Sequence, residues 1–243
     1  MDDSKKFFAE SRKNVKLMNK DDDLKKLSWK WFVKTFKYKY PYNFTWLGLP
    51  VIQYPHDLVL LQEIIWNLKP RIIVETGVAR GGSLIFYASM INLLNNKGKV
   101  IGIDIDIRKH NKNNIKKHPM FKNIDLIQGS SIEKKVLEKV KKKINNKKPV
   151  MIILDSNHTH NHVLSELNLY SELITKESFF VVFDTHCEFL PKKLIPNRPW
   201  GKGNSGYTAV KEFLKQNKKF KNVNFEDKTL VSCAPFGFLK KIS

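Results

Sequence analysis

Two aspartates, Asp155 and Asp184, directly follow two five-residue apolar runs, 150–154 and 179–183. Short apolar runs of this kind are typical of buried strands, and the ends of neighbouring parallel strands lie about 5 Å apart. Two carboxylates at that distance repel each other unless a cation or a proton lies between them. A hard, oxygen-seeking cation such as Mg²⁺ suits the pair, so Asp155 and Asp184 are the predicted metal ligands. The alternative is that both acids are simply solvated at the starts of loops.

Three histidines at alternate positions, His158, His160 and His162, come soon after Asp155. Imidazole is a common ligand of transition metals, but alternate residues just before a helix converge on one point only if the loop curls. A metal site made of these histidines alone is therefore disfavoured. An imidazole ionises near neutral pH, so the same side chains are suited to proton transfer.

A glycine-containing turn follows the predicted strand 71–75. Glycine permits a tight strand-to-helix connection and lets a ligand approach the backbone. The pattern is not Gly-x-Gly-x-x-Gly, and a pyrophosphate here would be repelled by the Glu75 carboxylate. S-adenosylmethionine carries a sulfonium and an ammonium, so an acid beside the turn suits it. The alternative is a turn that needs glycine for packing only. The predicted cofactor-binding residues of this turn are Glu75, Thr76, Gly77, Ala79, Gly81 and Ser83.

The cofactor site is predicted to extend to the ends of the next strands. Asp104 ends the predicted strand 100–104, where an acid can accept hydrogen bonds from ribose hydroxyls; a helix cap at the neighbouring Asp106 is the alternative. Ser130 and Ser131 follow the predicted strand 124–128 and are candidates to line an adenine pocket. Ser130 also begins a capping-box pattern, Ser-x-x-Glu, which would explain that serine structurally. Asp155 borders the same crevice and completes the predicted cofactor-binding set.

The elements that must position these residues alternate between strand and helix from residue 57 onwards. Such alternation predicts an α/β fold with a doubly wound, mostly parallel sheet, and ligands bind beyond the carboxyl ends of its strands. The tail, 231–242, is expected to add an edge strand pair. The predicted helices are 57–68, 82–94, 132–144, 161–174 and 206–216, and the predicted strands are 71–75, 100–104, 124–128, 150–154 and 179–183.

Composition restricts the class of protein further. The chain has 243 residues and a formal net charge of +21, with 39 lysines and only five arginines. Arginine is the favoured side chain for bidentate contacts to bases, so sequence-specific nucleic-acid recognition is disfavoured. The charge is read either as a solvated lysine surface or as attraction to an anionic partner, including a phosphorylated substrate. No apolar stretch reaches the length of a transmembrane segment or a signal peptide, and two cysteines make no disulfide framework, so a cytoplasmic setting is expected.

The first 45 residues differ from the rest and are predicted to form a separate N-terminal arm, with the main domain at 46–243. A polar, helix-prone stretch, for which the acidic residues 21–23 offer a start, leads into aromatic residues interleaved with lysines at 29–46. Aromatic side chains between lysines can stack on bases or lie on a membrane surface. More often such rings pack on their own domain or on another subunit, so a homo-oligomer formed through the arm is a candidate.

Together these segments resemble the metal-dependent O-methyltransferases grouped with cephalosporin hydroxylase and rhamnosyl O-methyltransferase. The resemblance implies a seven-stranded, Rossmann-like class I methyltransferase sheet, with S-adenosylmethionine in the crevice and Mg²⁺ beside it. It implies an O-methyltransferase acting on a hydroxyl of a sugar or sugar-containing small molecule, such as a nucleotide sugar or a surface polysaccharide precursor. Its motifs run from about residue 47 to 239, in the segments 51–55, 75–77 with 81–83, 102–104, 154–163 with 166, 167 and 170, 184–185, 200–204 and 237–239.

The resemblance also implies residue roles. Related catechol-type enzymes carry their lysine base three residues after the first metal-binding aspartate, where this chain has His158, so His158 is the predicted base and His162 the second choice. The family usually has a glutamate before Asp184, where this chain has Phe183, so the third metal ligand is open between Thr185, His186, Glu188 and water. The competing functions are a nicotinamide-dependent oxidoreductase on a similar sheet and a non-catalytic basic nucleic-acid-binding protein.

Overall fold

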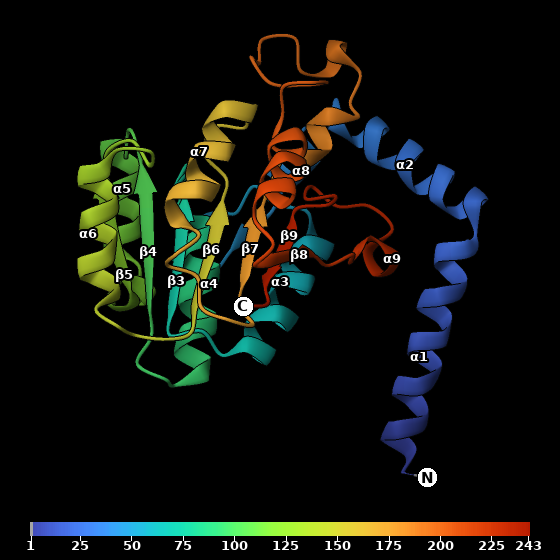
Figure 1. The fold of residues 1–243 in the computed structure, drawn as a ribbon, viewed down its shortest axis with the longest axis horizontal. Coiled ribbons are helices and arrows are strands. Elements are labelled where there is room, and N and C mark those ends of the chain that lie inside the picture. The colour runs from blue at the N-terminus through green and yellow to red at the C-terminus, as the bar shows by residue number, and fades with distance from the viewer. Residues whose placement is uncertain (1) are drawn as a thin grey trace.

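The computed structural model describes residues 2–243, and a seven-stranded sheet lies at its centre (Figure 1). The strand order is β5-β4-β3-β6-β7-β9-β8, and every neighbouring pair is parallel except the two that β9 makes with β7 and β8. This confirms the predicted doubly wound, mostly parallel sheet. The strands are β3 (Ile72–Thr76), β4 (Lys99–Asp104), β5 (Ile124–Gln128), β6 (Val150–Leu154), β7 (Phe179–Val182), β8 (Phe220–Asn222) and β9 (Phe238–Lys241).

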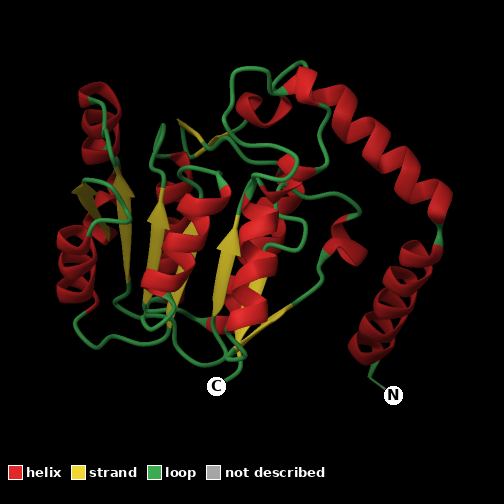
Figure 2. Cartoon of the chain, turned by 45° about the horizontal axis from the view of Figure 1, so that its top comes forward, coloured by secondary structure: helices red, strands yellow, loops and turns green. Residues whose placement is uncertain are grey.

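Helices cover both faces of this sheet, which explains why the central strands are continuous apolar runs. Every residue of β3 and of β6 is buried, as expected for a parallel strand with helices on both sides. One face packs its core against α3 (Pro55–Leu68) and α4 (Gly82–Leu94). The other packs against α6 (Lys134–Ile144), α7 (His160–Tyr170) and α8 (Gly206–Gln216). Figure 2 shows α7 and α8 lying in front of the strands.

The shorter elements complete the chain between these layers. β1 and β2 pair with each other as a two-stranded antiparallel ribbon just before α3. None of the helices between residues 2 and 243 combines the length and the apolar character that a membrane-spanning segment needs. The remaining elements are β1 (Thr45–Trp46), β2 (Leu49–Pro50), α5 (Lys109–Lys117), α9 (Glu226–Thr229) and four 3₁₀ helices at Tyr40–Asn43, Pro119–Asn123, Thr185–Glu188 and Lys192–Leu194.

One predicted helix end and one predicted helix cap are wrong, for identifiable reasons. The helix predicted to reach residue 174 ends at Tyr170, where the buried ammonium of Lys241 donates to the carbonyl oxygens of Ser171 (3.1 Å) and Ile174 (2.9 Å). The Lys241 ammonium thus takes the place of the backbone N–H groups that would donate to these carbonyl oxygens if the helix continued. The Ser130 capping box does not form, because α6 has an extended Glu133 at its N-cap and no side-chain cap. Instead, the backbone N–H of Glu133 donates a hydrogen bond to the carbonyl oxygen of Ser130.

The tail also differs from the prediction. It supplies one strand, β9, rather than a pair, and its partner β8 comes from before residue 231. β9 is not at the edge, since it lies between β7 and β8 with Leu239 opposite both Phe180 and Asn222.

The N-terminal arm consists of α1 (Asp3–Lys20) and α2 (Asp22–Phe36), which extend away from the sheet layers in Figure 1. The acidic start of α2 is as predicted, because Asp21 caps the helix by accepting from the Leu24 backbone N–H at 2.8 Å. α1 buries no residue, whereas Phe32 of α2 is fully buried and stacks on Tyr54 with ring centroids 4.8 Å apart. The aromatic segment therefore packs partly on its own domain, as one of the sequence alternatives held.

Candidate active site

The first turn after β3 has a backbone that only glycine fits at its first position. Gly77 has φ +92°, and a Cβ there would overlap the carbonyl oxygen of Asp155 at the end of β6. Asp104, at the end of β4, holds the next part of the turn, since its Oδ2 accepts from the backbone N–H of Val78 (2.8 Å) and Ala79 (3.2 Å). Ala79 is thereby kept in the left-handed region, at φ +44°. The ends of β3, β4 and β6 are thus fixed to one another.

Two predicted cofactor residues lie beneath this turn rather than on its surface. Glu75 and Thr76 are buried and line neither of the two cavities at this end of the sheet. Ser83 donates to the Glu75 carboxylate at 2.8 Å, and burial raises the pKa of Glu75 to about 8. The Glu75 carboxyl therefore stabilises the turn from within. Of the other predicted turn residues, Gly77 and Ala79 line both cavities, and Gly81 and Ser83 line the larger one.

The smaller cavity, of about 350 Å³, lies beside the ends of β3, β4 and β5. Its lining includes Asp104, Ser130, Ser131 and Asp155, all four predicted to bind the cofactor. It also includes His162, whose Nε2 lies 3.2 Å from the hydroxyl oxygens of both Ser131 and Ser156. His162 therefore faces the predicted cofactor crevice rather than the paired aspartates.

The larger cavity, of about 740 Å³, contains the predicted metal and base residues. β6 and β7 are neighbours in the sheet, so Asp155 and Asp184 follow adjacent strand ends as expected. His158 lies between them, with Nε2 3.2 Å from Asp184 Oδ2 and 4.0 Å from Asp155 Oδ1. Asp155, His158 and Asp184 thus bring one possible ligand atom each within 4.8 Å of one another. Asp184 has φ +56°, so a strained residue aims this carboxylate.

The charges and burial of Asp155, His158 and Asp184 favour a bound cation. Burial, together with the neighbouring Asp184 carboxylate, raises the pKa of Asp155 well above its ordinary value. Burial lowers the pKa of His158, although Asp184 opposes this effect, so the imidazole is neutral near pH 7. The His158 ring also packs edge-on against Trp200, with centroids 4.9 Å apart. The site therefore holds a neutral, well-positioned imidazole beside two carboxylates that repel each other.

Hydrogen-bond partners distinguish the candidates for a third metal ligand, since they show which side chains face the paired aspartates. Phe183 is completely buried in the core. The Thr185 hydroxyl donates to the Pro235 carbonyl at 2.7 Å, and Glu188 accepts from the Ser205 hydroxyl at 2.6 Å. Neither therefore faces the paired aspartates.

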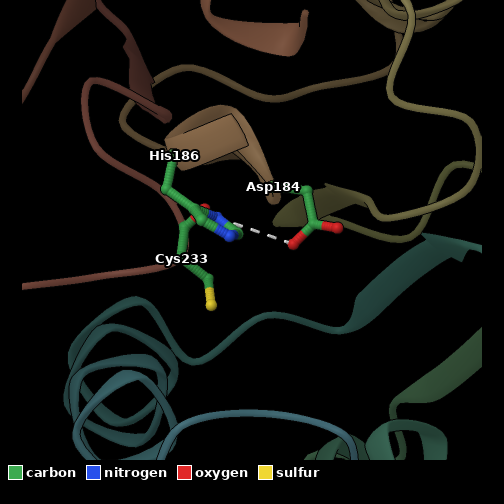
Figure 3. Close-up of side chains that lie close together, drawn as sticks. All are labelled: Asp184, His186 and Cys233. Carbon is green, nitrogen blue, oxygen red and sulfur yellow. Dashed lines mark hydrogen bonds and ion pairs between the residues drawn. The ribbon is translucent and has the colours of Figure 1, made fainter. Parts of the chain in front are cut away.

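His186 remains beside the acids. Its Nδ1 lies 3.7 Å from Asp184 Oδ1 and 3.1 Å from the Cys233 carbonyl oxygen. Figure 3 shows Asp184, His186 and Cys233 gathered around this point, and their possible ligand atoms lie within 4.8 Å of one another. Asp184 therefore belongs to two potential ligand groups, and His158 and His186 are the nitrogen donors nearest to it. His160 points elsewhere, to Thr208 Oγ1 at 2.8 Å.

Several residues of this cavity were not assigned roles from the sequence. Gln53 donates to Asp155 Oδ2 at 3.2 Å, and Trp200 packs on His158. Both stand in segments that carry the family resemblance, but 102 residues separate Gln53 from Asp155. Only the fold brings them together. Cys187 and Cys233, the two cysteines of the chain, are unpaired and also line the cavity.

A sheet of this order, with cavities at the carboxyl ends of β3 and β6 where the strand order reverses, defines a class I methyltransferase fold. The family model described as Rhamnosyl O-methyltransferase/CmcI matches residues 38–242. The chain belongs to this family and is an S-adenosylmethionine-dependent O-methyltransferase. This decides against the alternatives of a nicotinamide-dependent oxidoreductase and a non-catalytic nucleic-acid-binding protein.

Individual relatives agree with this assignment. A rhamnosyl O-methyltransferase of Mycobacterium tuberculosis is 27% identical over 199 residues, covering 80% of this chain and 77% of the relative. CmcI solved with Mg and SAM has a TM-score of 0.57 at 20% identity, covering 83% of this chain and 78% of that one. The MycE methyltransferase, solved with Mg, SAH and mycinamycin VI, has a TM-score of 0.52 at 17% identity, covering 77% of this chain and 49% of that one. At these identities the two solved structures establish the fold alone.

Proposed function

We propose that this enzyme methylates a sugar hydroxyl, with Asp155 and Asp184 holding Mg²⁺ and His158 acting as the base. The observation that carries the proposal is the convergence of these three side chains in the larger cavity, directly beside the glycine turn. The curated relative is named a rhamnosyl O-methyltransferase, which supports a sugar as acceptor. A cavity of about 740 Å³ has room for one, and Trp200 offers an aromatic wall.

The residues present fit a magnesium ion. Mg²⁺ is usually held by one or two carboxylates, with water and substrate oxygens in its other positions. Asp155 and Asp184 supply two. Burial, followed by the neighbouring Asp184 carboxylate, raises the pKa of Asp155, and a divalent cation would stabilise both acids in the ionised form. When bound, Mg²⁺ would lower the pKa of an acceptor hydroxyl. Phe183 contributes no ligand, so this proposed site depends on Asp155 and Asp184 together with neighbouring nitrogen or water ligands.

The residues of the smaller cavity fit the nucleoside part of S-adenosylmethionine, which supplies the methyl group when bound. Asp104 and the serines Ser130 and Ser131 offer acceptors and donors for ribose and adenine there. Gly77 and Asp155 line both cavities, so a cofactor whose nucleoside occupies the smaller one would direct its methyl end towards the larger. His162 would then contact the cofactor side.

His158 is positioned to remove the acceptor proton. Its Nε2 faces the carboxylate pair, and its lowered pKa keeps that nitrogen free to accept a proton at neutral pH. Asp184, at 3.2 Å, stabilises the imidazolium that forms. Trp200 packs edge-on against the ring and helps to hold it in place. Methyl transfer is an in-line displacement, so holding the hydroxyl in line with the methyl donor supplies much of the rate.

The test compares His158→Ala and Asp155→Asn with wild type in methyl transfer to a rhamnoside acceptor. His158→Ala is expected to lower kcat by about 10²–10⁴-fold, because it removes a positioned general base. It should leave the affinity for S-adenosylhomocysteine unchanged. Asp155→Asn is expected to abolish the dependence of the rate on Mg²⁺.

His160→Ala is the matched control, since His160 points to α8 and away from the cavity, and it should retain the wild-type kcat. If His158→Ala keeps the wild-type kcat, the base assignment is wrong. If the wild-type rate does not respond to Mg²⁺ or to its removal by a chelator, the metal assignment is wrong.

A further inference from the structure

The larger cavity is lined by cations from three separate segments. Lys37 and Lys39 follow α2 at the end of the arm, Arg80 belongs to the glycine turn, and Lys193 and Arg198 come from the loop between β7 and α8. All five side chains are exposed. Within residues 2–243, none of them forms an ion pair with a carboxylate. Their charges are therefore available to a ligand.

The carboxylates of this cavity are more buried than its cations. Asp155 and Asp184 are the acidic residues among those that line it, and both take part in the proposed metal site. The cavity thus combines two partly buried acids with five exposed cations. Charges of one sign around a cleft raise the local concentration of an oppositely charged ligand.

Arg198 is the cation that the structure connects most directly to the reaction centre. Its guanidinium carbon lies 5.0 Å from the ring centroid of Trp200, which also packs against the His158 ring at 4.9 Å. A single aromatic side chain therefore separates Arg198 from the proposed base. The Lys192 ammonium donates to the Arg198 carbonyl oxygen at 2.8 Å and ties this loop together.

The choice of arginine is informative in this chain, which uses lysine at 39 of its 44 cationic positions. Two of its five arginines, Arg80 and Arg198, line the same cavity. Guanidinium binds phosphate oxygens bidentately and stacks on aromatic rings, which an ammonium does less well. Arg198 stacked on Trp200 is an arrangement that suits a phosphate group next to a sugar ring.

We propose that the acceptor is a phosphorylated sugar, whose phosphate or diphosphate is held by Arg198 and Arg80 while its hydroxyl reaches His158. Lys37, Lys39 and Lys193 attract the same group. This inference rests on the proposed sugar methylation and adds the charge of the acceptor. A nucleoside diphosphate sugar and a lipid diphosphate sugar share this chemistry, and the experiment separates them.

The experiment measures binding by calorimetry to enzyme saturated with S-adenosylhomocysteine, so that the cofactor crevice is filled. The probes are rhamnose 1-phosphate, a nucleoside diphosphate rhamnose, a short-chain polyprenyl diphosphate rhamnose and the neutral methyl rhamnoside. The phosphorylated probes are expected to bind at least about 10-fold more tightly than methyl rhamnoside, since a charged hydrogen bond contributes about 1.5–3 kcal/mol. That advantage should shrink as salt is raised. Whichever diphosphate binds more tightly identifies the source.

Arg198→Gln and Arg80→Gln are expected to remove most of this advantage, and Arg198→Lys to restore part of it, because lysine keeps the charge without the bidentate geometry. Arg108→Gln is the matched control, since Arg108 is an exposed arginine outside both cavities, and should behave as wild type. S-adenosylhomocysteine affinity should stay unchanged in all four.

Equal affinity for rhamnose 1-phosphate and methyl rhamnoside would overturn the inference. So would wild-type phosphate binding by both glutamine variants, or binding of phosphate probes only when S-adenosylhomocysteine is absent. These outcomes leave the methyltransferase proposal standing if S-adenosylhomocysteine and methyl rhamnoside still bind. Failure of the wild-type enzyme to bind S-adenosylhomocysteine would instead defeat the proposed function itself.

Discussion

Replacing Asp104 by alanine tests how the cofactor crevice is built. Its carboxylate accepts three backbone N–H groups, from Val78 (2.8 Å) and Ala79 (3.2 Å) at Oδ2 and from Asp106 (3.0 Å) at Oδ1. The turn that it holds contains a left-handed Ala79, a conformation that costs a non-glycine residue about 1–2 kcal/mol. Without the carboxylate, this turn is expected to relax and the crevice to lose its shape.

The size of the effect follows from these contacts. A hydrogen bond to a charged group contributes about 1.5–3 kcal/mol, and bonds that share one carboxylate are not additive. Asp104→Ala is therefore expected to weaken S-adenosylhomocysteine binding by about 10–150-fold, the equivalent of one such bond to the ligand. The free energy of unfolding should fall by about 2–3 kcal/mol, because the turn also loses its acceptor. Calorimetry and denaturant unfolding measure the two quantities separately.

Two further variants and a modified ligand sharpen the result. Asp104→Asn keeps one acceptor oxygen and should lie between alanine and wild type, whereas Asp106→Asn, at a mostly exposed neighbour, should bind as wild type. If Asp104 also accepts from the ribose, wild type should prefer 5′-methylthioadenosine to its 2′-deoxy analogue, and Asp104→Ala should lose that preference. An Asp104→Ala protein that is as stable as wild type and binds S-adenosylhomocysteine as tightly would refute the reasoning.

Two other predictions concern the strand end beneath the cofactor. Gly77→Ala should reduce both stability and S-adenosylhomocysteine binding, because its Cβ would overlap the Asp155 carbonyl. Gly48→Ala is the control, since Gly48 has the same φ of +92° with open space around it. Equal unfolding free energies for the two variants would contradict the clash. Burial raises the pKa of Glu75 from 4.5 to about 8, so between these values the folded chain keeps a proton that the unfolded chain releases. The free energy of unfolding should therefore fall as pH rises from about 5 to 8, by at most about 1.4 kcal/mol per pH unit. Unfolding curves of Glu75→Gln should lack this part of the pH dependence, and an identical slope in both proteins would show that Glu75 does not contribute.

The sequence was sufficient to predict the sheet and the strand ends that carry Asp155 and Asp184, because a buried parallel strand is a short apolar run and the first polar residue after it marks its end. It was less informative about which way a polar side chain faces. Asp104 was correctly placed at the end of β4, but the pattern does not reveal that backbone N–H groups occupy much of its carboxylate. The sequence predicts that Glu75 faces the cofactor, but its position within a fully buried strand puts the carboxyl inside the core.

Long-range packing accounts for the rest. His162 lies one helical turn beyond His158, yet the two face different cavities, because His158 precedes α7 while His162 is on the helix opposite Ser131. No local pattern reports where the loop after β5 will lie. The same holds for Lys241, which ends α7 from 70 residues away. Periodicity predicted the buried face of α7, but a lysine side chain from β9 determines where the helix ends.

Phe183 connects these observations to the chemistry of the site. The residue before Asp184, Phe183, directly follows β7 and is completely buried in the core. Thr185 and Glu188 bond elsewhere, so the potential ligands left around Asp184 are Asp155, His158, His186 and Cys233. One of these, His158, lies 3.2 Å from Asp184 in a buried setting that keeps it neutral. A site with two carboxylates therefore has less negative charge than one with three, and depends more on its imidazoles. In the proposed metal site, Phe183 stands where the family resemblance implies a glutamate, so Asp155 and Asp184 are the carboxylates that remain, with the His158 imidazole 3.2 Å from Asp184.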